Sequence, residues 1–422
     1  MTPAQTSQVS DSLDHLFRHH AGQMVSVLSR IFGVGNIDAI EDSVQDALVA
    51  ALQKWPFGET PDNPRAWLIE VAKNRLYDRL RREKRSDSID DETHELIDLH
   101  DPTRDTHFVG EFGEDELKMI FACCHPAVPP DSQVALTLKT VGGFGVGEIA
   151  AAYLAKEEAV AKMLSRAKQK LRSGIRFEVP AGDELKPRLD AALRALYMMF
   201  NEGYAASTGE ALIRRDLCFE AVRLARIIAG HPVTAAPKVH ALIALFCFQA
   251  ARLPARSDDR GDLVLLSEQD RLLWDGRMIA EGIEHLRRSA AGDELSDYHL
   301  EAEIASCYAL AESFETIDWK RILKCYDLLQ SGRYSPVVEL NRIIAFGRVN
   351  GAEKALEELS RLGENYLMTS FNFFHLTRAY FLAELRQNER AAEAYRRAAD
   401  LTRNDAVARF IQKRLAEISK IS

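Results

Sequence analysis

The 422-residue sequence contains no uninterrupted apolar run close to the roughly 20 residues that a membrane-spanning helix needs. Its N-terminus, MTPAQTSQVSDSLDHLF, has no basic stretch followed by an apolar one, so it does not resemble an export signal. Both absences lead us to expect a cytoplasmic protein. The chain is too long for one ordinary core, because domains usually hold about 100 to 200 residues, so we expect several domains.

The six cysteines are scattered without a CxxC pair, and most lie among apolar residues with helical spacing, so we interpret them as reduced core thiols. Cys123, Cys124 and His125 raise the alternative of a metal site. Adjacent residues of a helix face different ways, however, and no second ligand pair follows at zinc spacing. We expect no metal and no cofactor.

Motifs of catalysis are absent as well: there is no GxSxG, P-loop or HExxH. We therefore expect no enzymatic activity and no catalytic residue. One polar motif, Asn201-Glu202-Gly203-Tyr204, is interpreted as a buried hydrogen-bonding turn, with a catalytic or ligand site as the alternative.

Strand patterns are few, whereas apolar residues recur at three- and four-residue spacing, so the sequence predicts an all-α protein. Helices are expected at 40–55, 65–85, 132–141, 148–153 and 157–172, with Asp131 as the N-cap of the third. Prolines between 56 and 64 mark a loop before the second of these helices.

The net charge of −9 hides an uneven distribution. Seven cations fall within thirteen residues at the end of one predicted helix: Lys73, Arg75, Arg79, Arg81, Arg82, Lys84 and Arg85. A helix C-terminus favours two or three cations but does not account for seven, so we favour polyanion binding over simple solvation. Residues 87–116 then carry twelve acidic side chains, with Arg104 as the opposing cation, and predict an extended or weakly helical linker.

The segment 146–172 has the layout of a helix-turn-helix. The longer second helix has a predicted inner stripe of Val160, Leu164, Ala167 and Leu171. The residues expected to be exposed are Ala161, Lys162, Ser165, Arg166, Lys168 and Gln169. Short side chains early and cations later suit a recognition helix, which reaches base edges first and holds phosphates with its flanks. An ordinary αα-hairpin is the alternative.

The second half of the chain reads as further helices without a basic stripe, so nucleic-acid contact is not indicated there. Ala345 and Ala379 are 34 residues apart, and Ala391, Tyr395 and Ala398 have the small-large-small spacing of a tetratricopeptide helix. We expect a helical extension module at 183–330 and tetratricopeptide-like helical repeats at 331–422.

Taken in order, these elements resemble bacterial RNA polymerase sigma factors of the extracytoplasmic-function type, which belong to the sigma-70 family. IEDSVQDA at 40–47 resembles region 2.2, NPRAWLIEVAKNRLYDRLRREKR resembles regions 2.3 and 2.4, and EIA followed by AVAKMLSRAKQKLR resembles region 4.2. FACCHPAVPPDSQVALTLKTVGGFGVGEIA, LYMMFNEGYAAS and GDLVLLSEQDRLLWD resemble the subgroup that carries a long C-terminal tetratricopeptide-like extension. The resemblance implies sigma region 2 at 10–85, an acidic linker at 86–113 and sigma region 4 at 114–177.

It also implies partners and residue roles. Asp42, Gln45 and Asp46 would bind the β′ coiled coil of the RNA polymerase core, whose β flap is the second expected contact. The −10 promoter element would be held by Asn63, Lys73, Asn74, Arg75, Arg81 and Arg82. The −35 element would be held by Lys156, Ala161, Lys162, Ser165, Arg166 and Lys168. Ala161 stands where many such factors have a cation, so we expect the phosphate grip to shift to Lys162 and Arg166. Trp67 is interpreted as a core residue, with stacking on a base as the alternative.

We therefore expect an alternative sigma factor whose C-terminal extension regulates it in cis through a surface for a regulatory protein or ligand. One alternative is a DNA-binding transcription regulator with a helical sensing domain, which would bind promoters without polymerase. A tetratricopeptide scaffold without a DNA role is the other, but it leaves the seven clustered cations unexplained.

Overall fold

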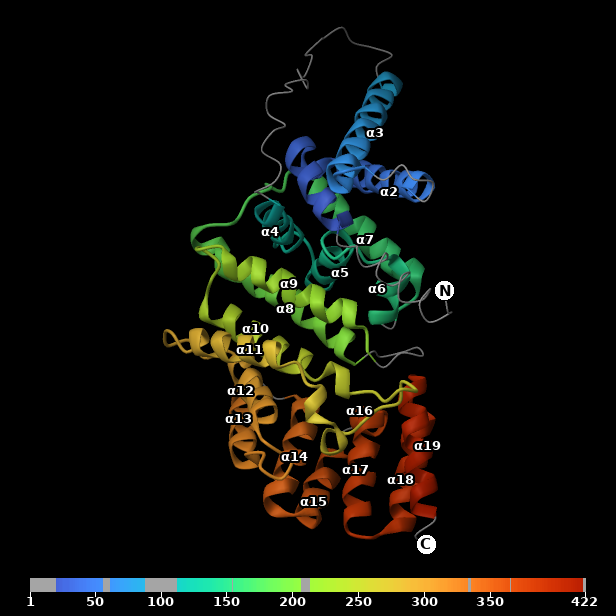
Figure 1. Ribbon diagram of the computed structural model, residues 1–422, viewed down its shortest axis with the longest axis vertical. Coiled ribbons are helices and arrows are strands. Elements are labelled where there is room, and N and C mark those ends of the chain that lie inside the picture. The colour runs from blue at the N-terminus through green and yellow to red at the C-terminus, as the bar shows by residue number, and fades with distance from the viewer. Residues whose placement is uncertain are drawn as a thin grey trace. The chain divides into compact units, whose positions relative to one another are not determined.

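The computed structural model describes residues 20–55, 61–87, 112–153, 155–205, 213–332, 335–364 and 366–419. In these ranges the chain is built of helices and their connections, and extended pairing is confined to isolated bridges, such as the one between Ser257 and Leu263 (Figure 1). The expectation of an all-α protein is confirmed. None of the helices in the described ranges has the length and apolar character that crossing a membrane requires. The chain forms two compact units, one of residues 1–198 with 230–234 and one of 199–229 with 235–422.

The first unit begins with a helix at 20–32, followed by the 3-10 turn η1 (Val34–Asn36) and the paired helices α2 (Ile37–Lys54) and α3 (Pro64–Asp87). α3 begins after Asn63, whose side-chain oxygen accepts a hydrogen bond from the amide of Ala66 at 3.1 Å. Proline suits the first helical position because its missing N–H would have no partner there. The predicted helices at 40–55 and 65–85 are thus confirmed to within a few residues.

Four further helices of this unit are α4 (Phe112–Cys123), α5 (Pro130–Thr140), α6 (Val146–Ala152) and α7 (Glu157–Arg172). The bounds predicted for α7 are confirmed. The N-cap predicted for α5 is wrong: Pro129 occupies that position, and Asp131 lies in the first turn. Pro130 starts the helix instead, for the same reason as Pro64 starts α3.

The acidic segment predicted to be a linker ends earlier in the structure than the sequence indicated. α4 begins at Phe112, and its carboxylates Asp115 and Glu116 are buried against the helix at 20–32. Arg30 Nε donates to Asp115 Oδ2 at 2.9 Å, and Gln23 Nε2 donates to Glu116 Oε2 at 3.3 Å. These two charges therefore belong to a folded contact, because each has a long-range partner that offsets its desolvation. The linker proper, 88–111, lies outside the described residues.

The cysteines are unpaired, and all except the half-buried Cys307 are buried. Cys123 Sγ lies 3.0 Å from Thr140 Oγ1, and Cys124 Sγ lies 3.8 Å from Thr137 Oγ1. Burial raises the pKa of the Cys123 thiol, and it raises that of Cys124 to about 12. No group of three or more metal-ligating side chains occurs among the residues that the structure describes.

After the 3-10 turn η4 (Gly182–Glu184), α8 (Leu185–Tyr204) passes from the first unit to the second. Arg188, near the start of α8, is buried and donates from Nη2 to the backbone oxygen of Phe121 at 2.6 Å. The beginning of α8 is therefore part of the first unit, although the sequence suggests a boundary just before it.

The second unit continues with helices that pack mostly on their neighbours in sequence. They are α9 (Arg215–Gly230), α10 (Pro237–Ala250), α11 (Gly276–Ser289), α12 (Asp297–Leu310), α13 (Trp319–Gly332), α14 (Pro336–Asn350), α15 (Ala352–Leu362), α16 (Tyr366–Thr369), α17 (Asn372–Glu384), α18 (Asn388–Leu401) and α19 (Asp405–Ser419). α17, α18 and α19 lie side by side (Figure 1). Three 3-10 turns, η5 (Leu253–Ala255), η6 (Leu266–Glu268) and η7 (Arg271–Leu273), lie between α10 and α11.

Small residues allow the last helices to approach closely. Ala345, Ala379, Ala391 and Ala398 are each 1% exposed or less. A Cβ atom at Gly347 would lie 2.6 Å from the ring of Phe381, so this position has room only for glycine. α14 and α15 form a pair of helices within 331–422, where helical repeats were expected.

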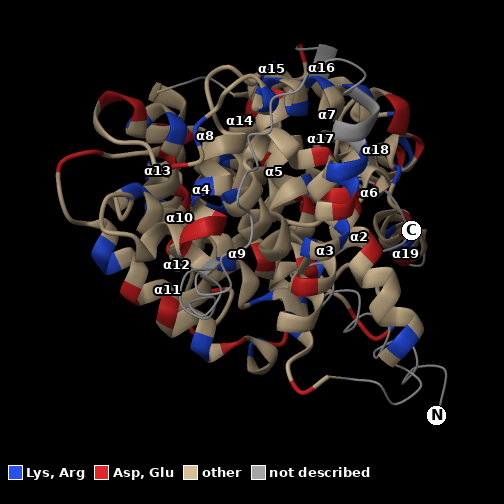
Figure 2. Ribbon diagram, turned by 90° about the horizontal axis from the view of Figure 1, so that it is seen from above, with Lys and Arg blue, Asp and Glu red and all other residues tan. Residues whose placement is uncertain are grey.

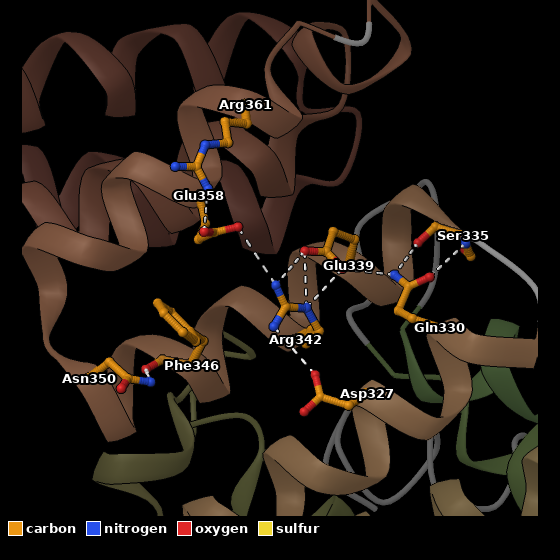
Figure 3. A network of polar contacts seen from close by, with 9 residues as sticks. All are labelled: Asp327, Gln330, Ser335, Glu339, Arg342, Phe346, Asn350, Glu358 and Arg361. Carbon is orange, nitrogen blue, oxygen red and sulfur yellow. Dashed lines mark hydrogen bonds and ion pairs between the residues drawn. The ribbon is translucent and has the colours of Figure 1, made fainter.

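A polar network joins α13, α14 and α15 (Figure 3). The guanidinium group of Arg342 on α14 lies 2.9 Å from Glu339, 3.4 Å from Asp327 on α13 and 3.7 Å from Glu358 on α15. Gln330 Nε2 donates to Glu339 Oε2 at 3.0 Å. One side chain of the middle helix thus holds carboxylates of both its neighbours.

Candidate nucleic-acid interface

α7 has the amphipathic form that a recognition helix requires. The predicted inner stripe of Val160, Leu164, Ala167 and Leu171 is buried, at 4% exposure or less, and it packs against α5 and α6. Ile149 and Ala150 of α6 are buried at 1% and 3% exposure. The apolar stripe fixes the opposite face of α7 toward the outside of the unit.

That outer face carries most of the residues predicted to contact the −35 element. Ala161, Lys162, Ser165 and Arg166 are all exposed. Lys156 is exposed at the extended N-cap position of α7, with φ −75° and ψ 144°. The structure thus brings these five residues together on the first turns of one helix, where side chains of a recognition helix reach bases.

Lys168 is the exception, and the expectation that it is exposed is wrong. Its side chain is 12% exposed, and its Nζ lies 2.7 Å from Glu41 Oε2 and 3.1 Å from Asp38 Oδ1. Burial opposes its charge, but the two carboxylates outweigh burial and raise the pKa of Lys168. Arg172 Nη2 also lies 3.2 Å from Asp38 Oδ2. Lys168 and Arg172, near the end of α7, are therefore paired with carboxylates of α2, and Lys168 is not free for phosphate in this arrangement.

A second contact holds the same two parts of the first unit together. Gly22, in the helix at 20–32, lies so close to the turn after α5 that a Cβ atom would stand 1.9 Å from the backbone oxygen of Val141. Together with the ion pairs of Lys168, this contact packs the region of α2 and α3 directly against the region of α4 to α7.

α2 presents an outer face of mixed character. Asp42 and Gln45 are exposed, Asp46 is half-buried, and Val49 and Leu52 on the same face are 50% and 55% exposed. The spacing of these residues, at three or four positions, puts them in one row along the helix.

The two acidic residues of this row are paired with α3. Arg79 lies 3.0 Å from Asp42 Oδ2 and 2.8 Å from Asp46 Oδ2, and Arg75 Nη1 lies 3.5 Å from Asp46 Oδ2. The hydrogen bond from Arg79 lowers the pKa of Asp46. Sequence reasoning counted Arg79 only among the clustered cations, but its place between the two carboxylates makes it the residue that orients them.

The residues of α3 that were predicted to hold DNA differ in how far they are exposed and paired. Asn74, Arg81 and Arg82 are exposed, whereas Lys73 is 13% exposed at its side chain, with Nζ 3.6 Å from Glu70 Oε2. Basic and acidic positions are interleaved around α2 and α3 (Figure 2). The side chains of 83–87, including Lys84 and Arg85, lie outside the described residues.

Two further predicted residues of this region have structural contacts. Asn63 is exposed and caps α3 with its side chain. Trp67 is half-buried, with its ring centroid 5.7 Å from that of Trp55, which supports the core role over base stacking.

Comparisons with known proteins fit this geometry. Residues 16–86, which include α2 and all but the last residue of α3, match the family Sigma-70 region 2. Residues 188–290 match a family of unknown function, DUF6596. Uncharacterized protein R00370 of Rhizobium meliloti (strain 1021) is 35% identical over 400 residues, covering 94% of this chain and 93% of the relative. No solved structure matches.

Proposed function

We propose, since the chain belongs to the sigma-70 family of RNA polymerase sigma factors, that it is an alternative sigma factor of the extracytoplasmic-function type. As a member of that family it acts in transcription initiation, with the polymerase core and promoter DNA as partners. The proposal assigns region 2 to residues 10–85, the linker to 86–113 and region 4 to 114–177.

The observation that carries the proposal is one compact unit in which the region 2 match is followed by an exposed, basic recognition-type helix. Ala161, Lys162, Ser165 and Arg166 on α7 would read the −35 element, and Lys156 would contact a phosphate at the start of that helix. Asn74, Arg75, Arg81 and Arg82 would hold the −10 element, with Asn63 and Lys73 at its edge. Asp42, Gln45 and Asp46 would dock on the β′ coiled coil, beside the exposed Val49 and Leu52.

The packed arrangement of the first unit would then be the state without promoter. Elements at −10 and −35 lie roughly 80 Å apart along DNA at 3.4 Å per base pair. A helix that reads −35 cannot keep a 2.7 Å contact between Lys168 and Glu41 on the part that reads −10. Promoter binding would separate the two parts and release Lys168 for phosphate.

Co-purification tests the proposal as a whole. The full chain, mixed with core RNA polymerase, should elute with it and direct initiation from a defined promoter in vitro. A chain that binds promoter DNA alone, and neither binds core nor directs initiation, would instead be a conventional transcription regulator.

Arg166→Ala tests the assignment of α7. If Arg166 makes a bidentate base contact, initiation at a promoter that depends on its −35 element should weaken by about 1 to 3 kcal/mol in template affinity. Arg176→Ala is the control, because Arg176 is 77% exposed but lies beyond the end of α7. Equal losses in the two variants would count against a reading role for Arg166.

The C-terminal extension, with the tetratricopeptide-like helices from 331, would regulate the sigma part in cis. Its regular helix pairs and the absence of a basic stripe support a surface for a regulatory protein or ligand. The relative from Rhizobium meliloti aligns over nearly the whole chain, so both parts occur together there as well.

A further inference from the structure

Three arginines of the second unit meet around two aromatic rings. Arg252 and Arg256 follow α10 and both contact Tyr204: Arg252 Nη2 donates to Tyr204 Oη at 2.5 Å, and the guanidinium carbon of Arg256 lies 3.5 Å from the ring centroid. Arg252 and Arg271 both face Trp274, with guanidinium carbons 5.9 Å and 4.3 Å from its ring centroid. The cluster therefore joins the end of α8, the residues after α10 and the turn η7.

The hydrogen bonds of these guanidinium groups go to neutral acceptors within the described part of the chain. Arg252 uses the Tyr204 hydroxyl, and Arg271 Nη1 donates to the backbone oxygens of Tyr308 and Ala311 at 3.2 Å and 2.6 Å. Glu315 is exposed and acts on Arg271 only through space. Positive charge thus accumulates here without a described carboxylate bound to it.

Several buried donors of the cluster have no acceptor. Arg256 and Trp274 are 9% and 8% exposed, and among the described residues Arg256 Nη1, Trp274 Nε1 and Arg271 Nη2 have no hydrogen-bond partner. Buried polar groups are nearly always bonded in folded proteins, and buried charges are paired. Burial lowers the pKa of Arg256, and the neighbouring Arg252 lowers it further. The cluster therefore combines positive charge with buried N–H donors that have no described acceptor, and this combination suits an anionic ligand.

We propose that this cluster, formed by Arg252, Arg256, Arg271 and Trp274, binds a small molecule that carries a doubly charged oxyanion, either a phosphate or a dicarboxylate. Planar guanidinium groups present paired N–H donors that match the oxygens of such groups, and the indole N–H adds a further donor. η7 lies on the solvent side of the cluster, because Arg271 is half-buried and its neighbour Leu272 is 92% exposed.

The proposed site includes a contact to a polar motif that has no role in the proposed sigma-factor function. Tyr204 closes the Asn201-Glu202-Gly203-Tyr204 motif, and all of the cluster lies within 188–290, the segment matched to a family of unknown function. Its residues are separate from those proposed to contact promoter or polymerase, so its test stands apart from theirs.

Calorimetry on the full chain tests the proposal with inorganic phosphate, succinate and chloride at matched ionic strength. We expect saturable binding of phosphate or succinate, and a rise in melting temperature that chloride does not reproduce. The better of the two ligands identifies the class of oxyanion. If neither binds more tightly than chloride, the proposal is wrong.

Arg271→Gln locates the site, with Arg277→Gln as the matched control. Arg277 is exposed in the first turn of α11, six residues from Arg271 in the sequence. Its substitution by Gln removes the same charge outside the cluster. Loss of a charge-assisted bond should weaken oxyanion binding roughly 10- to 100-fold in Arg271→Gln and leave it unchanged in Arg277→Gln. Circular dichroism confirms that each variant is folded. Equal affinities in the two folded variants would overturn the assignment.

Discussion

At the scale of single residues, the histidine pair between α10 and α11 links stability to pH. His240 and His285 have their Nδ1 atoms 2.9 Å apart. Burial, followed by the charge of His240, lowers the pKa of His285 to about 4 from 6.5, although Glu281 opposes this shift. Below about pH 6.5 the unfolded chain therefore binds a proton at His285 more readily than the folded chain does. The stability that the folded chain has at neutral pH is lost progressively as pH falls from about 6.5 toward 4.

His285→Asn should therefore reduce the loss of stability on acidification. In the natural chain, protonation of His285 in the unfolded state should lower the free energy of unfolding by about 1 to 2 kcal/mol between neutral pH and about pH 5. Urea unfolding at both pH values measures the difference. His20 and His125, whose pKa values burial also lowers, should keep part of the slope in the variant. A slope identical to that of the natural chain would contradict this account.

The success of sequence reasoning at this scale depended on distance along the chain. The buried stripe of α7 follows from a periodicity within one helix, so Val160 and Leu171 could be assigned inward without a partner. Lys168 could not be assigned, because its partner Glu41 is 127 residues away. The three-arginine cluster was missed for the same reason, since Tyr204, Arg252 and Arg271 lie in separate segments.

At the scale of helices, Arg342 should control how firmly α13, α14 and α15 pack. Its side chain is 18% exposed and holds three carboxylates, which would repel one another without it. Arg342→Ala should lower the free energy of unfolding by about 1 to 3 kcal/mol, as measured by urea titration.

Arg361→Ala provides the comparison for that measurement. Arg361 is 70% exposed and pairs with Glu358 within α15, and such exposed pairs are worth about 0.2 to 1 kcal/mol. If Arg361→Ala lowers the free energy of unfolding as much as Arg342→Ala does, the ion pairs of Arg342 between helices contribute no more than an exposed pair within one helix.

Helix positions were predictable where start and stop residues agreed with periodicity, as for α3 and α7. The start of α4 was not, because Asp115 and Glu116 continue an acidic run and look solvated. Their burial depends on Arg30 and Gln23 in a helix far away in sequence. Local charge could not reveal that compensation.

At the scale of the whole molecule, the contact between α2 and α7 should act as a restraint on DNA binding. Asp38→Lys would replace the shared partner of Lys168 and Arg172 by a third cation. Asp38 itself is 48% exposed, so each lost pair should be worth about 0.2 to 1 kcal/mol, and the separated state should become several-fold more populated. We expect a larger radius of gyration in solution scattering and tighter binding to −35 DNA.

Asp183→Lys controls for the added charge, because Asp183 is exposed in η4, away from this contact. It should gain DNA affinity only through the general attraction of one more cation. Compaction unchanged in both variants would show that the ion pairs do not hold the first unit closed.

The buried thiols have a practical consequence for following such a separation. Maleimide reagents react with thiolates, and burial holds the pKa of Cys124 and Cys218 at about 12 and that of the half-buried Cys307 at about 11. A cysteine introduced on an exposed face should therefore be labelled far faster than the native ones. Fluorescent dyes can be attached to the natural background, and opening of the first unit can be watched in single molecules without first removing any native cysteine.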